Sequence, residues 1–203
     1  MGPATAAVVE STTTNVNSNN PLPIALQYLG VNELDPRGNA LRTELWDAIH
    51  GKGSANSKKM TNSNAPWCAA FVNYVLGQTG TPDMLSPNGD PFTLGRAQEF
   101  GRVGSPVPGK NKGQKLNNAK PGDVVVLRGS EGWHVSFYAG HDPQSGKVYL
   151  LGGNQADSVK VSAFDSKTVT DIRRVRVDRL TNNEQEEISK LITGQPTSSE
   201  STR

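Results

Sequence analysis

The spacing of apolar residues changes character about halfway along the chain. In the first half they recur at helical intervals, and one helix face is formed by Leu41, Leu45, Ala48 and Ile49 at i, i+4, i+7 and i+8. From residue 123 onward they form short runs rich in β-branched residues, at 123–127, 134–139 and 148–151. Helices followed by an antiparallel meander predict an α+β domain.

Gly, Pro and capping residues set the expected element boundaries in the first half. Helices are expected within 21–30, around Leu41 to Ile49, and from Pro66 to Leu76, where Pro66 suits the first helical position. A polar loop is expected over 51–64. A short helix is expected around 93–100, followed by a long loop rich in Gly, Pro and Lys that runs to Lys120.

The second half is predicted to be a meander that ends in a helix. A hairpin turn over 141–147 separates two strands, and alternating apolar residues predict further strands at Val159 and Val161 and at Ile172, Val175 and Val177. Thr181 and Glu184 match a capping box ahead of a short helix. The expected organisation is a disordered leader over 1–20, one domain over 21–180, and a short helix with a polar tail over 181–203.

Composition narrows the class of protein. A chain of 203 residues with 34% hydrophobic residues suits one domain with a sizeable core. The net charge of +2, without clustered Lys and Arg, does not predict a nucleic-acid partner. No apolar run of about 18 residues is present, so no membrane insertion is expected, and the N-terminus lacks the basic segment and long apolar core of a secretory signal.

Cys68 is the single cysteine, and it stands at the expected start of a helix. The first N–H groups of a helix are unpaired and carry partial positive charge, which favours a thiolate over a thiol. A thiolate is the nucleophile of cysteine hydrolases and needs a histidine partner. The alternative interpretation of Cys68 is a small buried hydrophobic residue.

His134, at the start of a predicted strand, is the candidate partner. Asn154 follows the end of the next strand, and the start of one hairpin strand lies beside the end of its partner, so Asn154 is expected near His134. An amide oxygen that accepts the ring N–H would fix the tautomer and orientation of the imidazole. Gln155 is the alternative for this role, in which case Asn154 is a turn residue.

Four segments together resemble the NlpC/P60–CHAP superfamily, and most closely its small branch from phages and bacteria. They read PWCAAFVN at 66–73, PGDVVV at 121–126, WHVSFYAG at 133–140 and LGGNQ at 151–155. The likeness covers roughly residues 22–178. It implies a papain-like fold, with N-terminal helices packed on an antiparallel sheet, that hydrolyses amide bonds in peptidoglycan stem peptides without metal or cofactor.

Carried over residue by residue, the resemblance assigns Cys68 as nucleophile, His134 as base and Asn154 as the third member. Trp67, Trp133 and Gln155 are expected to contact substrate, with a core position as the alternative for Trp67. Trp133 departs from the family pattern, which usually has glycine before the histidine.

The resemblance predicts an endopeptidase of the D-Glu–diaminopimelate type that acts as a phage lysin or an interbacterial toxin. The alternatives are an N-acetylmuramoyl-L-alanine amidase and a non-catalytic wall-binding or virion structural module with the same fold. The expected partner is bacterial peptidoglycan, and an immunity protein, a holin or a virion component is a further candidate. Without a signal peptide, the protein is expected to be made in the cytoplasm and to act in the periplasm or cell wall after phage lysis, virion delivery or secretion.

Overall fold

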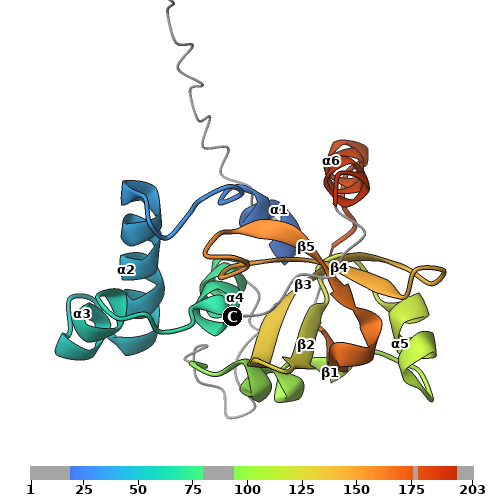
Figure 1. Ribbon diagram of the computed structural model, residues 1–203, viewed down its shortest axis with the longest axis horizontal. Helices are drawn as coiled ribbons and strands as arrows, with labels where there is room; N and C mark the ends of the chain where they lie inside the picture. The colour runs from blue at the N-terminus through green and yellow to red at the C-terminus, as the bar shows by residue number, and fades with distance from the viewer. Residues whose placement is uncertain (1–18, 80–93, 176–177, 196–203) are drawn as a thin grey trace, which may run out of the picture.

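A six-stranded antiparallel sheet with helices around it forms the body of the protein (Figure 1). The computed structural model describes residues 19–79, 94–175 and 178–195. In chain order the elements are α1 (Pro21–Leu26), α2 (Pro36–His50), α3 (Ala55–Thr61), α4 (Cys68–Gln78), the 3₁₀ helix η2 (Ala97–Arg102), β1 (Ser105–Pro106), α5 (Lys112–Asn118), β2 (Val124–Gly129), β3 (Gly132–Asp142), β4 (Lys147–Gly152), β5 (Lys160–Asp165), the 3₁₀ helix η3 (Ser166–Thr168), β6 (Val169–Arg174) and α6 (Asn182–Thr193).

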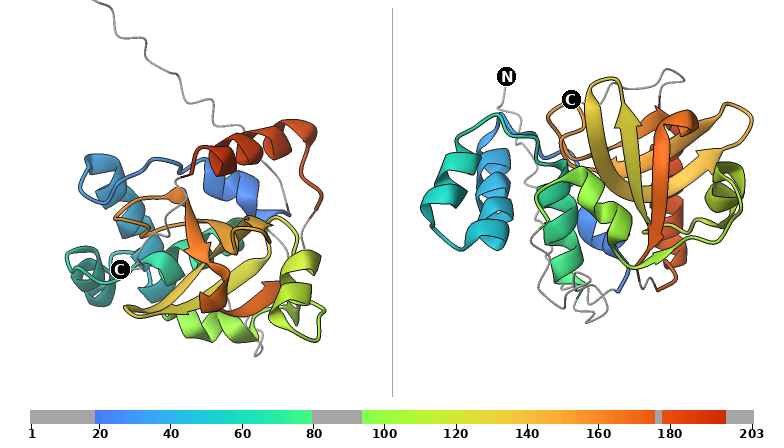
Figure 2. Two further views of the ribbon diagram at one scale, coloured as in Figure 1. Left: turned by 45° about the vertical axis from the view of Figure 1, so that its right-hand side comes forward. Right: turned by 90° about the horizontal axis from the view of Figure 1, so that it is seen from below.

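The sheet curls until its two ends approach each other. Its strand order is β1-β6-β2-β3-β4-β5, so β2, β3 and β4 lie between β6 and β5. Only the three residues of η3 connect the end of β5 to the start of β6. A connection this short spans no more than about 10 Å, which is less than the width of three intervening strands in a flat sheet. The sheet is therefore strongly curved, as the right-hand view in Figure 2 shows.

Each face of the sheet has its own hydrophobic core. The face toward α1 and α4 is lined by Val124, Val126, Val135 and Phe137. Apolar side chains fill the other, concave face, among them Val125, Leu127, Tyr138, Leu150, Phe164 and Ile172. The alternation of side chains along β2 and β3 explains this division, because neighbouring residues of a strand point to opposite faces.

The first four helices, α1 to α4, gather on one side of the sheet, whereas Leu116 of α5 packs into the core of the concave face. The α4 helix packs against β3 and is itself flanked by α1, while α2 and α3 lie on the far side of α4 from the sheet (Figures 1 and 2). The N-cap of α2 is Asp35, whose side chain accepts a hydrogen bond from Gly38 N–H, and Pro36 occupies its first position. In contrast, α4 follows Trp67 without any side-chain cap.

Most of the predicted elements are confirmed, but two expected loops contain helices. The expected polar loop over 51–64 contains α3, and the expected loop up to Lys120 contains α5. Both are short helices of polar sequence that begin at a capping residue, Ser54 for α3 and Asn111 for α5. A short polar helix lacks the apolar stripe on which the prediction relied, so only the caps signalled it.

The C-terminal helix α6 has the expected capping box, with Thr181 and Glu184 bonded reciprocally. It docks through Ile188, which is buried, and through Leu191 and Ile192. Gly140 in β3 permits this approach, because a Cβ there would lie 3.0 Å from Ile192. Of the expected leader over 1–20, residues 1–18 lie outside the described residues, as do the tail beyond Gln195 and the strand position Val177. Asn20, which was expected to be disordered, is buried and caps α1. None of the described helices combines the length and apolar character needed to cross a bilayer.

Candidate functional site

The Cys68 thiol lies at the first residue of α4, as expected, and is 3% exposed. Burial raises the pKa of the Cys68 thiol, because removing the sulfur from water penalises the thiolate. Backbone N–H groups of Val135, Ala69 and Cys68 itself act in the opposite direction and lower that pKa. The sulfur therefore lies between the N-terminus of α4 and the backbone of β3, at Val135, the residue that follows His134.

The His134 imidazole is held on one side by two polar side chains. Its Nε2 lies 3.2 Å from Gln155 Oε1 and 2.8 Å from Ser136 Oγ. All three side chains are buried, with His134 1% exposed. The other ring nitrogen, Nδ1, is buried and has no hydrogen-bond partner among the residues that the structure describes. Burial lowers the pKa of His134 to about 4, against the opposing effect of the Gln155 hydrogen bond.

The contacts of Gln155 determine which ring nitrogen carries the proton. Its amide Nε2 donates to Lys160 O at 2.6 Å and to Leu150 O at 3.2 Å, so Oε1 must be the atom that faces the ring. Oε1 accepts only, and Ser136 already donates to it at 2.9 Å. The hydrogen between Gln155 and His134 must therefore belong to ring Nε2. The neutral ring is the Nε2–H tautomer, and its basic nitrogen is the unpaired Nδ1.

The sulfur of Cys68 and the ring of His134 are not hydrogen-bonded to each other. Cys68 belongs to the core on the helix-facing side of the sheet. The His134 ring lies 5.5 Å from the ring of Phe164, which belongs to the core on the concave side. The backbone N–H that acts on the Cys68 sulfur belongs to Val135, the residue after His134 in β3. Both members of the expected pair are buried, and their side chains lie toward different cores.

Two consecutive glycines, Gly152 and Gly153, let the chain at the end of β4 pass close to the side chains around His134 and to Trp67. A Cβ at Gly152 would lie 2.1 Å from Ser136 Oγ and 3.0 Å from Gln155 Oε1, and a Cβ at Gly153 would lie 2.4 Å from the Trp67 ring. Distances this short are sterically excluded. The GlyGly pair is therefore required by close packing around the imidazole and around the residue before Cys68.

Asn154, the residue expected to be the third member of a triad, makes no hydrogen bond to the imidazole of His134. The hydrogen bond to His134 comes from Gln155, the alternative orienting residue. Asn154 adopts a left-handed φ of 57°, a conformation that asparagine tolerates better than most residues. Its local role is to turn the chain, so that the next side chain points back into the sheet.

The same loop concentrates backbone strain. Asn154, Ala156 and Asp157, with φ of 57°, 47° and 59°, are the only non-glycine residues with positive φ in the described part of the chain. Such conformations persist where surrounding contacts hold them, and they cluster at functional sites. Here the loop is tied to the α1–α2 connection, because Glu33 N–H donates to Asp157 O at 2.8 Å and Asn32 pairs with Ser158.

The two tryptophans expected to contact substrate lie in different environments. Trp67 is 1% exposed, its ring packs edge-on against Phe71, and its N–H donates to Glu33 Oε2 at 2.5 Å. Trp67 is thus a core residue, which was the alternative interpretation. Trp133 is 38% exposed and stacks with the Arg128 guanidinium at 5.2 Å. Of the two, only Trp133 presents its ring to solvent, beside His134 in the sequence.

Sequence reasoning missed two residues of this site. Ser136 stands two positions after His134, and strand alternation places both on one face, so a polar residue in an otherwise apolar strand was an available signal. Glu33 binds the residue before Cys68 from the α1–α2 connection, and no local pattern identifies such a contact.

Comparison with known proteins identifies no relative, because no family model, curated protein or solved structure matches the chain. Among the described residues, no three His, Cys, Asp or Glu side chains are grouped so that they could hold a metal ion. The candidate site is therefore defined by its own geometry and by the motifs of the sequence.

Proposed function

We propose that this protein is a cysteine hydrolase that cleaves an amide bond, with Cys68 as nucleophile and His134 as general base. The observation that carries the proposal is the state of the imidazole. Gln155 fixes the ring as the Nε2–H tautomer, and the basic Nδ1 remains buried and unpaired beside the residue whose N–H meets the Cys68 sulfur. A general base needs such a free lone pair and such an orienting partner.

The chemistry would proceed in two stages. The Cys68 proton moves to His134 Nδ1 as the sulfur attacks the substrate carbonyl, and the protonated imidazole then gives that proton to the leaving amine. Water hydrolyses the thioester with His134 again as base. Backbone N–H groups at the start of α4 are the donors for the oxyanion.

Both reacting groups must come closer together for this reaction. The thiol has a raised pKa and the imidazole a lowered one, so both are neutral at pH 7 in the buried state. Because the Cys68 sulfur is buried, the side chains that cover it must move before a substrate can reach it. Catalytic hydrogen bonds are often long in unliganded enzymes and shorten in the substrate complex.

The proposed substrate is bacterial peptidoglycan, and the proposed bond lies in its stem peptide. The four motifs that resemble the NlpC/P60–CHAP superfamily support this choice, as does the papain-like order of a cysteine helix followed by a histidine strand. The exposed ring of Trp133 next to His134 is the surface on which we expect the substrate to pack. The amidase remains the alternative reaction.

A second candidate is a non-catalytic module that binds cell walls or belongs to a virion. The observation that favours it is the burial of both Cys68 and His134 without a hydrogen bond between them. In that case the thiol is a core residue and the imidazole is a structural link between β3 and the loop after β4.

The test is digestion of purified peptidoglycan followed by mass spectrometry of the soluble fragments. New amine and carboxyl ends within the stem peptide indicate an endopeptidase, and separation of the peptide from the sugar indicates an amidase. Cys68→Ala and Cys68→Ser should release no fragments while retaining the wild-type melting temperature within a few degrees. Equal release by these variants overturns the hydrolase. Binding of wild type and Cys68→Ala to walls without any release supports the second candidate.

A further inference from the structure

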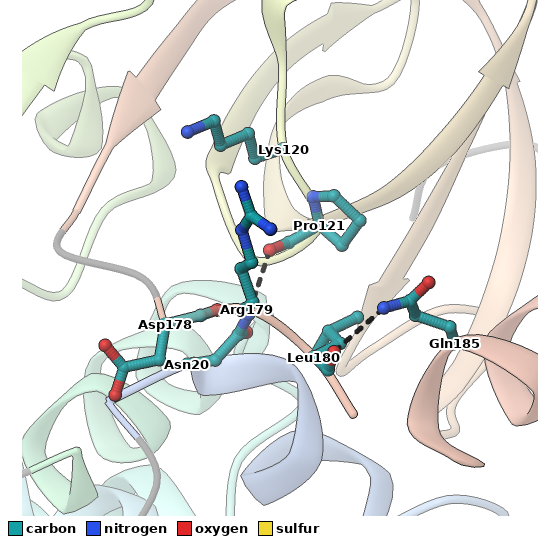
Figure 3. A pocket seen from close by; sticks show the side chains of 7 residues that line it. All are labelled: Asn20, Lys120, Pro121, Asp178, Arg179, Leu180 and Gln185. Carbon is teal, nitrogen blue, oxygen red and sulfur yellow. Dashed lines mark hydrogen bonds between the residues drawn. The ribbon is translucent and has the colours of Figure 1, made fainter. Parts of the chain in front are cut away.

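A pocket of about 340 Å³ opens at the end of the β2–β3 ladder away from His134 (Figure 3). Gly122, next to the pocket, donates to Tyr138 O, whereas His134 pairs with Leu127 further along β2. Tyr138 lies four positions after His134 in β3, which corresponds to roughly 14 Å of strand. The pocket is thus separate from the candidate catalytic site. Its walls are formed mainly by Asn20, Lys120, Pro121, Arg179, Leu180 and Gln185.

Hydrogen bonds between distant parts of the chain hold these walls in place. The Asn20 amide donates to Pro121 O at 3.1 Å and to Asp178 O at 2.9 Å. The Gln185 amide, from α6, donates to Leu180 O at 2.8 Å. The start of α1, the turn before β2 and the segment before α6 are therefore joined into one preformed hollow, which lowers the entropic cost of ligand binding.

The rim of the pocket carries two cations, Lys120 and Arg179, whose ammonium and guanidinium groups form no ion pair within the described part of the chain. Both side chains extend to the same side of the pocket, whereas the carboxylate of Asp178 points away from them (Figure 3). Two like charges on one rim repel each other, and an anion bound between them relieves that repulsion. The fork of Arg179 suits a planar carboxylate.

The other residues that line the pocket, and its volume, indicate the size and polarity of the rest of the ligand. Pro121 and the largely buried Leu180 give the pocket an apolar wall. In the first turn of α6, the N–H of Glu184 is already bonded to the Thr181 hydroxyl and the N–H of Gln185 to Thr181 O. The volume lies at the lower end of the range for small-molecule sites, about 300–1,000 Å³. A short apolar body with one anionic end fits these properties.

We propose that this pocket binds a small carboxylate carried on a short apolar group, with Lys120 and Arg179 holding the carboxylate and Pro121 and Leu180 contacting the apolar part. Such a carboxylate is presented by short acyl chains and by the C-terminal residue of a peptide. The proposal does not depend on Cys68 or on hydrolysis.

Titration of the full-length, ¹⁵N-labelled chain, followed by backbone amide shifts, tests the site. Hexanoate represents an acyl chain and N-acetylleucine a peptide end, hexanamide is the neutral counterpart, and inorganic phosphate is an oxyanion without an apolar body. We expect saturable shifts at Gly122 and Leu180 with either carboxylate, and weaker binding of hexanamide and phosphate. Tighter binding of hexanoate assigns the acyl source, and tighter binding of N-acetylleucine assigns the peptide source.

Variants make the test specific for the two cations. Lys120→Gln with Arg179→Gln should weaken carboxylate binding by about tenfold, as expected for the loss of charge-assisted contacts on an exposed rim. The matched control is Lys58→Gln with Lys59→Gln on the exposed side of α3, which removes the same charge and should leave binding unchanged. Equal binding of hexanamide, unchanged binding by the first double variant, or an equal loss in the control overturns the proposal. Cys68→Ala should bind like wild type, so failure of the hydrolase leaves this result unaffected.

Discussion

The hydroxyl oxygen of Ser136 lies 2.9 Å from the amide oxygen of Gln155, and two oxygens at this distance need a hydrogen between them. Because an amide oxygen carries none, the hydrogen is that of Ser136. The Ser136 hydroxyl is then committed to Gln155 and acts toward His134 only as an acceptor. A serine absent from the predicted triad thus helps to decide the tautomer of the candidate base.

Removal of the Gln155 oxygen should reverse that tautomer. In Gln155→Leu the Ser136 hydroxyl loses its acceptor and turns to donate to His134 Nε2, which moves the ring proton to Nδ1. Long-range ¹H–¹⁵N correlation spectra of the imidazole distinguish the two forms. Asn154→Gly, which keeps the left-handed turn, should retain the Nε2–H form. An Nδ1–H ring in the wild-type protein would contradict the network.

Gly152→Ala should destabilise the protein by about 2 kcal/mol, because overpacking of a filled core costs about 1–3 kcal/mol and the added methyl meets Ser136 Oγ. Urea unfolding measures this change. In the double variant Gly152→Ala with Ser136→Gly, the side chain that the new methyl meets is absent. We expect this variant to be more stable than the sum of the two single effects on the unfolding free energy predicts. Gly77→Ala in α4 is the control, since nothing lies within 4 Å of its added methyl and we expect a neutral or stabilising effect. If the effects of the two substitutions on the unfolding free energy simply add, the added methyl at position 152 does not clash with Ser136.

The buried imidazole predicts a loss of stability in mild acid. The pKa of His134 is about 4 in the folded protein and 6.5 as the reference value, so between these values the unfolded chain binds a proton that the folded chain does not. Unfolding free energy therefore falls as the pH decreases from about 6.5 to 4, by up to about 3 kcal/mol from this residue. Unfolding measured across this range should show a shallower slope for His134→Phe than for wild type. His50→Gln, at the exposed end of α2, should keep the wild-type slope. Identical slopes in all three proteins would show that His134 ionises freely in the fold.

Relief of strain at Ala156 should stabilise the loop. Alanine at a φ of 47° is unfavourable, and Ala156→Gly should raise the unfolding free energy by about 0.5–1 kcal/mol. Ala156→Val should lower it, because β-branched residues fit this conformation worst. Ala119→Gly is the matched control, because its φ of −66° is ordinary and glycine there should only cost stability. A loss of stability in Ala156→Gly similar to that control would show that the strain is not significant.

Local patterns were sufficient for much of this fold. The spacing of apolar residues predicted the helices α2 and α4 and the strands β2, β3 and β4. The Thr181–Glu184 pair predicted the start of α6. These features depend on residues within a few positions of one another, so composition and spacing carry them. The hairpin expected between the strands at 134–139 and 148–151 also predicted that His134 lies near the 154–155 segment.

The tertiary structure decided which side chain of that segment meets the imidazole. Asn154 has a positive φ and Gln155 does not. The loop that holds them packs against Trp67 and is bonded to Glu33, which come from other parts of the chain. Curling of the sheet by the short β5–β6 connection set the environment of His134. The sequence by itself determined the elements and the candidate residues, because these depend on local spacing. Only the folded chain determined their burial and hydrogen bonds, because solvent exclusion and packing depend on all segments at once.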